Sequence, residues 1–231
     1  MKKNYIVITG GVGFIGSNLI KLFLNKTKFN IISLDNYSVG KKQNEIKNKR
    51  VRYIKSDTKN ISKTLKLYKK KIHSLFHFGE FSRIYQSFLN MSTCIDSNTI
   101  GSNEVFNFCL LNNIKLIYSA TSASIGNNGN DKNLSPYAFT KAKNLELLEN
   151  LKKWFSFKFE IVYFYNVYGP NQIKKGNMAT VIGIFEHQFK DNKPISIVRP
   201  GSQTRRFTHV MDTIETCYEA WKKNKCRHYS I

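Results

Sequence analysis

The chain lacks the sequence patterns that build disulfide frameworks, metal centres or membrane spans. Its 231 residues include only four cysteines and four prolines. The cysteines form no CxxC pair and the histidines form no HExxH motif, so we expect neither a disulfide framework nor a metal site. No apolar run approaches the ~20 residues of a transmembrane helix, and glycines interrupt the first apolar run too early for a signal peptide. These absences predict a cytoplasmic protein without a membrane partner.

Acidic residues are also scarce, because 15 Asp and Glu stand against 37 Lys and Arg, which gives a formal net charge of +22. A surplus of this size attracts polyanions such as nucleic acids. The lysines are spread along the chain, however, and the densest runs, at 41–52 and 69–71, lack the aromatic side chains that stack on bases. We therefore expect a solvated basic surface and do not predict a nucleic-acid partner.

Strand-like and helix-like patterns alternate along most of the chain. The strand-like runs are 4–9, 31–34, 51–56, 74–77, 115–119 and 161–164. The helical patterns are 14–24, 61–70, 95–112, 137–154 and 179–190. Such an alternation predicts an α/β fold whose parallel sheet is covered by helices on both faces. After Gly169 the alternation breaks, and a polar stretch leads into the last helical pattern.

The stretch YIVITGGVGFIGSNLI joins the first strand to the first helix and carries glycines at three-residue intervals, Gly10, Gly13 and Gly16. Missing side chains allow a tight turn and a close approach to a pyrophosphate, which the amino terminus of the helix then faces. Asp35 ends the next strand, where a carboxylate can accept hydrogen bonds from the adenosine ribose and would repel a 2′-phosphate. This order predicts a Rossmann-type doubly wound sheet that binds NAD rather than NADP.

The stretch SPYAFTKAKN places Tyr137 four residues before Lys141, directly after Pro136. Proline favours the first turn of a helix, and residues four apart share one helix face. A phenol beside an ammonium can act as a base, but the same spacing also suits ordinary helix packing. The pair alone leaves both interpretations open.

Eight motifs occur in the order typical of one family: TGGVGFIG, LDNYSVG, LFHFGEFSRIYQS, NTIGSNEVFNFC, LIYSATSASIG, SPYAFTK, YFYNVYGP and RRFTHVMD. They cover nearly all of the chain. The sequence resembles the extended short-chain dehydrogenases/reductases, specifically the NAD-dependent nucleotide-sugar epimerases and dehydratases. Within that family it is most similar to UDP-glucose 4-epimerase-like enzymes.

The resemblance implies roles for three residues in catalysis. Tyr137 stands at the position of the catalytic base and acid, and Lys141 at that of the lysine that binds the nicotinamide ribose and lowers the tyrosine pKa. Thr121 stands where the family has the Ser or Thr that hydrogen-bonds the reacting oxygen of the sugar. An unperturbed tyrosine has a pKa of about 10, so a base working near pH 7 needs a shift of roughly 3 units.

The resemblance also implies two sets of binding residues. The cofactor set comprises Gly10, Gly13, Phe14, Ile15, Gly16, Asp35, Asn36, Asp57, Thr58, His77, Phe78, Gly79, Arg83, Asn98 and Lys141. The substrate set comprises Thr121, Tyr137, Asn166, Asn177 and Arg205. For Asp57 an ordinary helix amino-terminal cap is an equal alternative, and for Arg205 a solvated surface charge is. The implied partner is a nucleotide sugar, most commonly a uridine diphosphate sugar.

Departures from the family pattern favour epimerisation over elimination. The 4,6-dehydratases carry Asp-Glu directly after the catalytic threonine, whereas Ser122 and Ala123 stand here. Epimerisation needs neither acid, and we therefore expect an epimerase that acts at C4 through a 4-keto intermediate. The alternatives are a dehydratase, reductase or decarboxylase of the same family, or a non-catalytic NAD-binding protein.

The resemblance divides the chain into an NAD-binding domain, 1–168 with 206–231, and a segment of a substrate domain, 169–205. The family continues beyond the motif CRHYSI with most of its substrate domain, so we expect this small domain to be incomplete. A homodimer is also implied, through the helices expected at 95–112 and 137–154. Ordinary core packing would require the same apolar residues in these helices.

Overall fold

The computed structural model describes residues 3–230, apart from the side chains of residues 127–129. Its centre is a seven-stranded sheet in the order β3-β2-β1-β4-β5-β6-β9. The strands are β1 (Tyr5–Thr9), β2 (Asn30–Asp35), β3 (Val51–Lys55), β4 (Ile72–His77), β5 (Lys115–Thr121), β6 (Phe159–Phe164) and β9 (His228–Ser230). All neighbouring strands run parallel. The order reverses between β1 and β4, and this switch point is where ligands bind in open α/β sheets.

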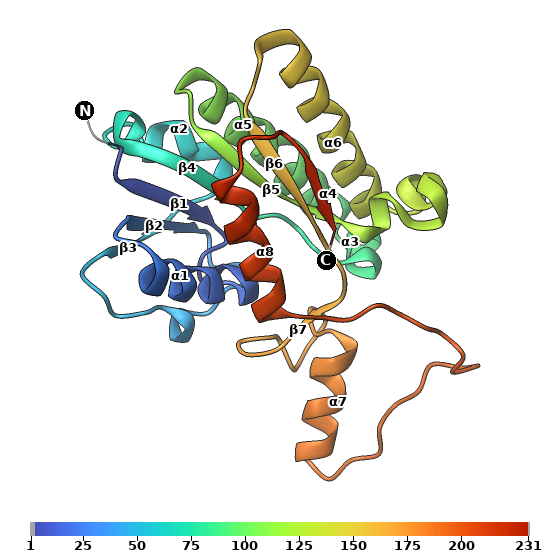
Figure 1. Ribbon diagram of the computed structural model, residues 1–231. Coiled ribbons are helices and arrows are strands. Elements are labelled where there is room, and N and C mark those ends of the chain that lie inside the picture. Colours follow the sequence, from blue (N-terminus) through green and yellow to red (C-terminus); the bar gives the residue numbers. More distant parts are fainter. Residues whose placement is uncertain (1–2, 231) are drawn as a thin grey trace.

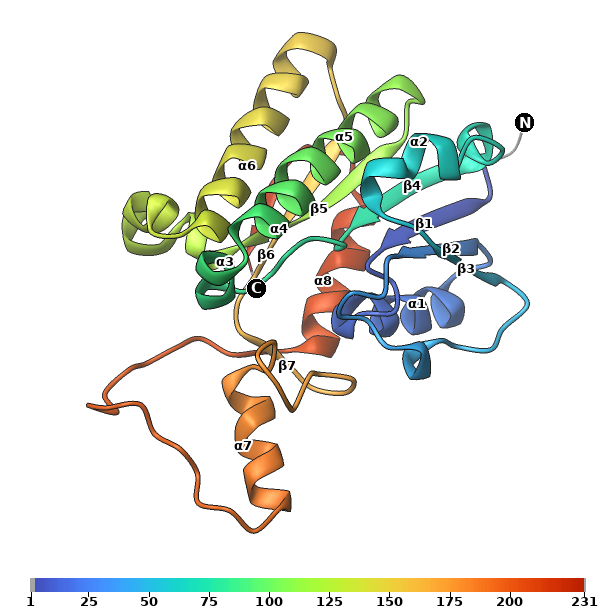
Figure 2. The same ribbon diagram turned by 180° about the vertical axis from the view of Figure 1, so that it is seen from behind.

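Helices cover both faces of the sheet (Figures 1 and 2). One face carries α1 (Phe14–Lys26) and α8 (Val210–Lys222), which contact each other. The other face carries α2 (Ile61–Thr64), α5 (Ser102–Leu111) and α6 (Pro136–Phe155). The short helices α3 (Ile84–Leu89) and α4 (Met91–Ile95) pack on α6. This arrangement confirms the doubly wound parallel sheet predicted from the sequence.

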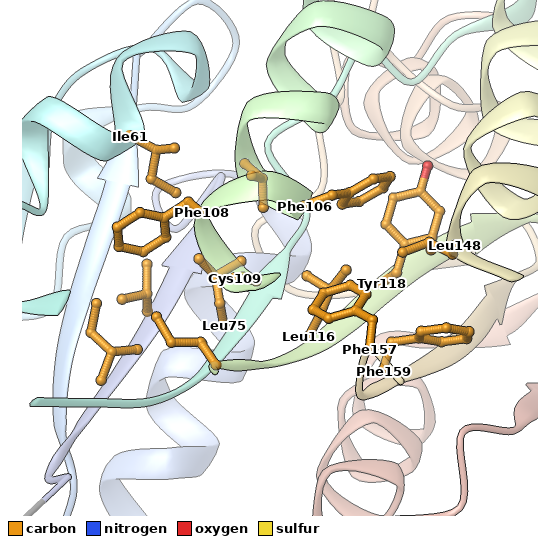
Figure 3. Packing of buried hydrophobic residues seen from close by; sticks show 14 of the residues in the cluster. Ile61, Leu75, Phe106, Phe108, Cys109, Leu116, Tyr118, Leu148, Phe157 and Phe159 are labelled. Atoms are coloured by element: carbon orange, nitrogen blue, oxygen red, sulfur yellow. The ribbon is translucent and has the colours of Figure 1, made fainter. Parts of the chain in front are cut away.

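The core consists of two apolar layers, one on each face of the sheet. On the α2, α5 and α6 side, Phe106 and Phe108 of α5 lie over strand residues such as Leu75 and Leu116 (Figure 3). On the other side, Phe23 of α1 packs edge-on against Phe76, Tyr218 and Trp221. Because both faces are covered, consecutive residues of β1, Ile6, Val7 and Ile8, are all apolar and buried rather than alternating.

Two expected helices differ from the structure. The pattern at 61–70 forms only α2 (Ile61–Thr64), followed by a turn and a 3-10 helix, Lys69–Lys71. Ile61 and Leu65 are buried, but Leu67 is 85% exposed, so the apolar face that would hold a longer helix ends early. The pattern at 95–112 begins earlier, with α4, and passes through a π-helical turn, Asp96–Gly101, into α5.

After β6 the chain forms a second, smaller group of secondary-structure elements. Strands β7 (Val167–Tyr168) and β8 (Thr208–His209) pair in parallel, and α7 (Val181–Lys190) lies between them in sequence. Helix α7 and the extended segment 191–207 project from the α/β body (Figure 1). Within residues 3–230, no helix combines the length and apolar character needed to cross a membrane.

Candidate active site

The loop between β1 and α1 has the geometry of a phosphate-binding turn. Gly10 has a φ of +69°, and a Cβ there would lie 2.9 Å from the backbone nitrogen of Gly79. A Cβ on Gly16 would lie 2.2 Å from the carbonyl oxygen of Gly10. Helix α1 begins after Gly13 with no side-chain cap and no acidic residue in its first turn. The backbone N–H groups of Phe14 and Ile15 thus open a helix terminus that suits an anion.

Asp35 lies at the carboxyl end of β2 and joins the glycine loop to the loop after β2. Its Oδ2 accepts the N–H of Val12 at 3.1 Å, and its Oδ1 accepts the N–H of Tyr37 at 2.8 Å. Burial raises the pKa of this carboxyl, while the two backbone hydrogen bonds oppose the rise. Each carboxylate oxygen keeps acceptor capacity, so Asp35 can still accept a ribose hydroxyl.

Asp57 acts as a cap in this structure. It accepts the N–H of Lys59 at 3.0 Å and precedes the 3-10 helix Thr58–Asn60, whose first residue, Thr58, is buried. Asn36 donates from its amide to the other carboxylate oxygen of Asp57 at 3.1 Å. Asn36 and Asp57 thus tie the loops that follow β2 and β3 together.

His77 ends β4 with a fully buried side chain. Thr9 Oγ1 accepts the N–H groups of Phe78 and Gly79, so its hydroxyl proton is directed at His77 Nδ1, 2.8 Å away. In that arrangement His77 Nε2 carries the proton and donates to Ser102 Oγ at 3.0 Å. Burial lowers the pKa of His77 to about 4, so the imidazole is neutral at pH 7. The backbone of Phe78 and Gly79, rather than the His77 ring, contacts the glycine loop.

Thr121 and Tyr137 meet where β5 ends and α6 begins. Ser135 caps α6 by accepting the N–H of Ala138 at 3.0 Å, and Pro136 occupies its first turn. The Tyr137 side chain lies within interaction range of Thr121. Burial raises the pKa of Tyr137 to about 12, although the Thr121 side chain opposes the rise. The structure therefore brings these two predicted residues together.

Lys141 lies one helical turn after Tyr137, with its side chain only 4% exposed. It forms an ion pair with Glu80 and donates to the carbonyl oxygen of Ser119. Sequence reasoning missed Glu80. The available signal was an acidic residue three positions after the end of a buried strand, in the motif HFGE, within a chain that has few acids.

Asn98 and Arg83 hold the loop between β4 and α3 in place. The fully buried Asn98 side chain accepts the N–H of Phe81 at 2.7 Å and donates to the Phe81 carbonyl and to Thr140 Oγ1. Arg83 donates from Nε and Nη2 to the carbonyl oxygen of Met178, at 2.9 and 2.7 Å. Arg83 thus ties this loop to the segment that precedes α7.

The other predicted substrate residues lie away from this network. Asn166 is exposed and donates to the carbonyl oxygen of Arg206 at 2.8 Å. Arg205 is exposed and, within the described part of the chain, donates only to its neighbours Thr204 and Gln203. Asn177 is exposed in the turn before α7. Among residues 3–230, no hydrogen bond joins these three side chains to Tyr137 or Lys141.

The fold and the glycine loop define a dinucleotide-binding protein of the Rossmann type. The family model described as "NAD dependent epimerase/dehydratase family" matches residues 6–231. The chain therefore belongs to the NAD-dependent epimerase/dehydratase family, whose members act on nucleotide sugars, and NAD is its cofactor.

Named relatives include epimerases with different nucleotides. A putative UDP-glucose 4-epimerase of Methanocaldococcus jannaschii is 27% identical over 94% of this chain and 74% of its own length. An ADP-L-glycero-D-manno-heptose-6-epimerase of Brachyspira hyodysenteriae is 29% identical over 90% of this chain and 69% of its own. A crystal structure of the UDP-N-acetylglucosamine 4-epimerase of Methanobrevibacter ruminantium M1, in complex with UDP-N-acetylmuramic acid, superposes with a TM-score of 0.89. That protein is 26% identical, and the match covers 100% of this chain and 77% of the other.

Proposed function

We propose that this protein is an NAD-dependent epimerase that inverts C4 of a nucleotide sugar, with a uridine diphosphate sugar as substrate. The observation that carries the proposal is the meeting of Tyr137 and Thr121 at the carboxyl end of β5, where the Thr121 side chain opposes the rise in the pKa of Tyr137. Thr121 is followed by Ser122 and Ala123, so neither an acid nor a base for eliminating water stands beside it. The pair can exchange one proton with a sugar hydroxyl, which is what epimerisation through a ketone requires.

The roles of the residues follow from this geometry. Tyr137 removes the proton of the sugar 4-hydroxyl and returns it when the ketone is reduced, while the Thr121 hydroxyl orients the same oxygen. NAD held in this site would supply the redox chemistry, a reversible hydride transfer at C4 that lets the hydride return to the opposite face of the sugar. The glycine loop and Asp35 hold the pyrophosphate and the adenosine ribose, and Lys141 binds the nicotinamide ribose.

The proton affinity of Tyr137 has to fall when the ligands bind. A pKa of about 12 lies about 5 units above neutral pH, which corresponds to about 7 kcal/mol. The ammonium of Lys141 is already neutralised by Glu80. The groups that arrive with the ligands therefore have to supply most of the stabilisation of the phenolate.

The substrate side of the site is proposed to include the segment 169–205. Asn166, Asn177 and Arg205 are exposed and uncommitted to the Tyr137 network, so they are available to bind the diphosphate and the nucleotide. A homodimer formed through α5 and α6 is proposed as well, since Ile100 and Phe139 near this face are half-exposed apolar side chains.

Proton NMR of the purified chain with NAD and either UDP-glucose or UDP-N-acetylglucosamine tests the proposal. We expect a new anomeric signal from the C4 epimer. Signals of a 4-keto-6-deoxy sugar would instead identify a dehydratase. Bound NAD without turnover of any sugar nucleotide would identify a non-catalytic protein and contradict the proposed activity.

A further inference from the structure

The carboxylate of Glu80 is the centre of a buried polar network that includes two residues of α6, Lys141 and Asn144. Its side chain is 3% exposed. One oxygen accepts three hydrogen bonds, from Ser102 Oγ at 2.8 Å, from the Tyr118 hydroxyl at 3.0 Å and from Asn144 Nδ2 at 3.2 Å. The other oxygen is ion-paired with Lys141. The acceptor capacity of the carboxylate is thus well used, as a buried charge requires.

The ammonium of Lys141 is held from three sides. Besides Glu80 it contacts the carbonyl oxygen of Ser119, and it lies 4.2 Å from the centre of the Tyr118 ring. A lysine removed from water tends to lose its proton, and burial does lower the pKa of Lys141, while Glu80 opposes that change. Glu80 therefore both fixes the ammonium and keeps it charged.

Structural stabilisation alone does not account for this pair. Two charges taken out of water gain little net stability, and apolar residues of similar volume serve a core at least as well. The pair nevertheless lies one helical turn from Tyr137, at the place where Lys141 is proposed to bind the nicotinamide ribose. The location points to the chemistry of the site.

We propose that Glu80 is a positioning residue that holds the protonated Lys141 ammonium in a single place beside Tyr137. This inference rests on the proposed epimerase function of the site. Glu80 acts through Lys141, and among the described residues its carboxylate bonds to the buried side chains of Ser102, Tyr118, Asn144 and Lys141.

Nitrogen-15 NMR of the lysine ammonium groups tests the placement without any turnover. A buried, hydrogen-bonded ammonium exchanges its protons slowly, so at neutral pH we expect a sharp signal that disappears in Lys141→Arg. Glu80→Gln keeps the shape but removes the charge, and we expect it to abolish or displace this signal. An unchanged Lys141 signal in folded Glu80→Gln, or its absence from the wild type, would overturn the proposal.

The matched control is Glu146→Gln, at a position on α6, the helix that also carries Lys141. It removes a carboxylate from Lys143, 2.8 Å away in an ion pair whose two side chains are about half exposed. We expect this variant to leave the Lys141 signal and the turnover unchanged. If it altered the Lys141 signal as Glu80→Gln does, the effect would be one of general charge and the proposal would fail.

Steady-state kinetics of the Glu80 variants and of the wild type test the role of Glu80 separately from the proposed activity of the site. We expect Glu80→Gln to lower kcat about tenfold or more, with a displaced pH profile and little change in KM, and Glu80→Asp to restore part of kcat. Wild-type kcat and pH profile in folded Glu80→Gln would overturn the inference. If the wild-type chain turns over no sugar nucleotide, the proposed function fails, and the ammonium signal still decides the role of Glu80.

Should Glu80→Gln not fold, Glu80→Asp carries the test. It keeps the charge on a side chain shorter by one methylene. We expect it to retain a displaced ammonium signal and to show reduced kcat. An undisplaced signal together with wild-type kcat would overturn the proposal.

Discussion

At the scale of single residues, hydrogen bonds fix the orientation and the bonding partners of the titratable side chains in the site. Thr9, His77 and Ser102 form a chain that ends on Glu80. Glu80 in turn fixes Lys141. The Tyr137 hydroxyl is not part of this chain and has Thr121 as its neighbour. The tyrosine is therefore the side chain best placed to exchange a proton with a ligand.

Replacing Tyr137 by phenylalanine removes only the hydroxyl. Because the proposed proton transfer then has no acceptor, we expect kcat to fall by about 10³-fold. Turnover of the nucleotide sugar measures this effect, and NAD affinity, measured by calorimetry, serves as the control and should stay near the wild-type value. Unchanged turnover in Tyr137→Phe would exclude the assigned base.

His77 makes the free energy of unfolding depend on pH. Its pKa falls from 6.5 to about 4 on folding, so the unfolded chain binds more protons between those values. Stability contributed by the neutral ring is thus present above pH 6.5 and is lost as the pH falls toward 4. Between pH 7 and 5 we expect a loss of about 2 kcal/mol from this residue.

Urea unfolding at pH 7 and pH 5 measures that loss. The glutamine of His77→Gln cannot be protonated. Between pH 7 and pH 5, the free energy of unfolding of this variant should therefore fall by about 2 kcal/mol less than that of the wild type. Equal changes in both proteins would show that His77 is not held neutral.

At the scale of elements, the parts with strong local patterns were predictable from the sequence. The β1–glycine–α1 unit and α6 were recognised because periodicity, glycine spacing and an amino-terminal Pro136 agree. The end of α2 and the π-helical turn before α5 could not be predicted, because both depend on contacts with side chains that are distant in the sequence. Asn98 lies in that turn and bonds to Phe81 and Thr140, which no local pattern reveals.

The glycine loop offers a direct test at this scale. Gly16→Ala places a methyl group 2.2 Å from the Gly10 carbonyl oxygen, so the turn must move. We expect NAD affinity to fall at least about tenfold, since the backbone N–H groups lose their alignment. Gly176→Ala is the control outside the glycine loop, because a Cβ there meets no atom within 4 Å. Calorimetric titration with NAD should leave this control unchanged.

At the scale of the whole molecule, the parallel sheet gathers the site at one edge. The glycine loop, Asp35, the Phe78–Gly79 backbone and Thr121 follow the carboxyl ends of four different strands. Sequence motifs identified these groups but not Glu80, whose importance comes from a partner 61 positions away in α6. The segment 169–205 carries Asn177 and Arg205 of the predicted substrate residues and projects from the α/β body (Figure 2), and Asn166 lies shortly before it.

The central claim is that C4 is oxidised and reduced within one bound complex. A nucleotide sugar deuterated at C4, incubated with the protein and NAD in ordinary water, tests it most directly. We predict that the C4 epimer, isolated and examined by NMR and mass spectrometry, retains the deuterium at C4. Loss of the label to solvent, or a product still in its original C4 configuration, would contradict the account.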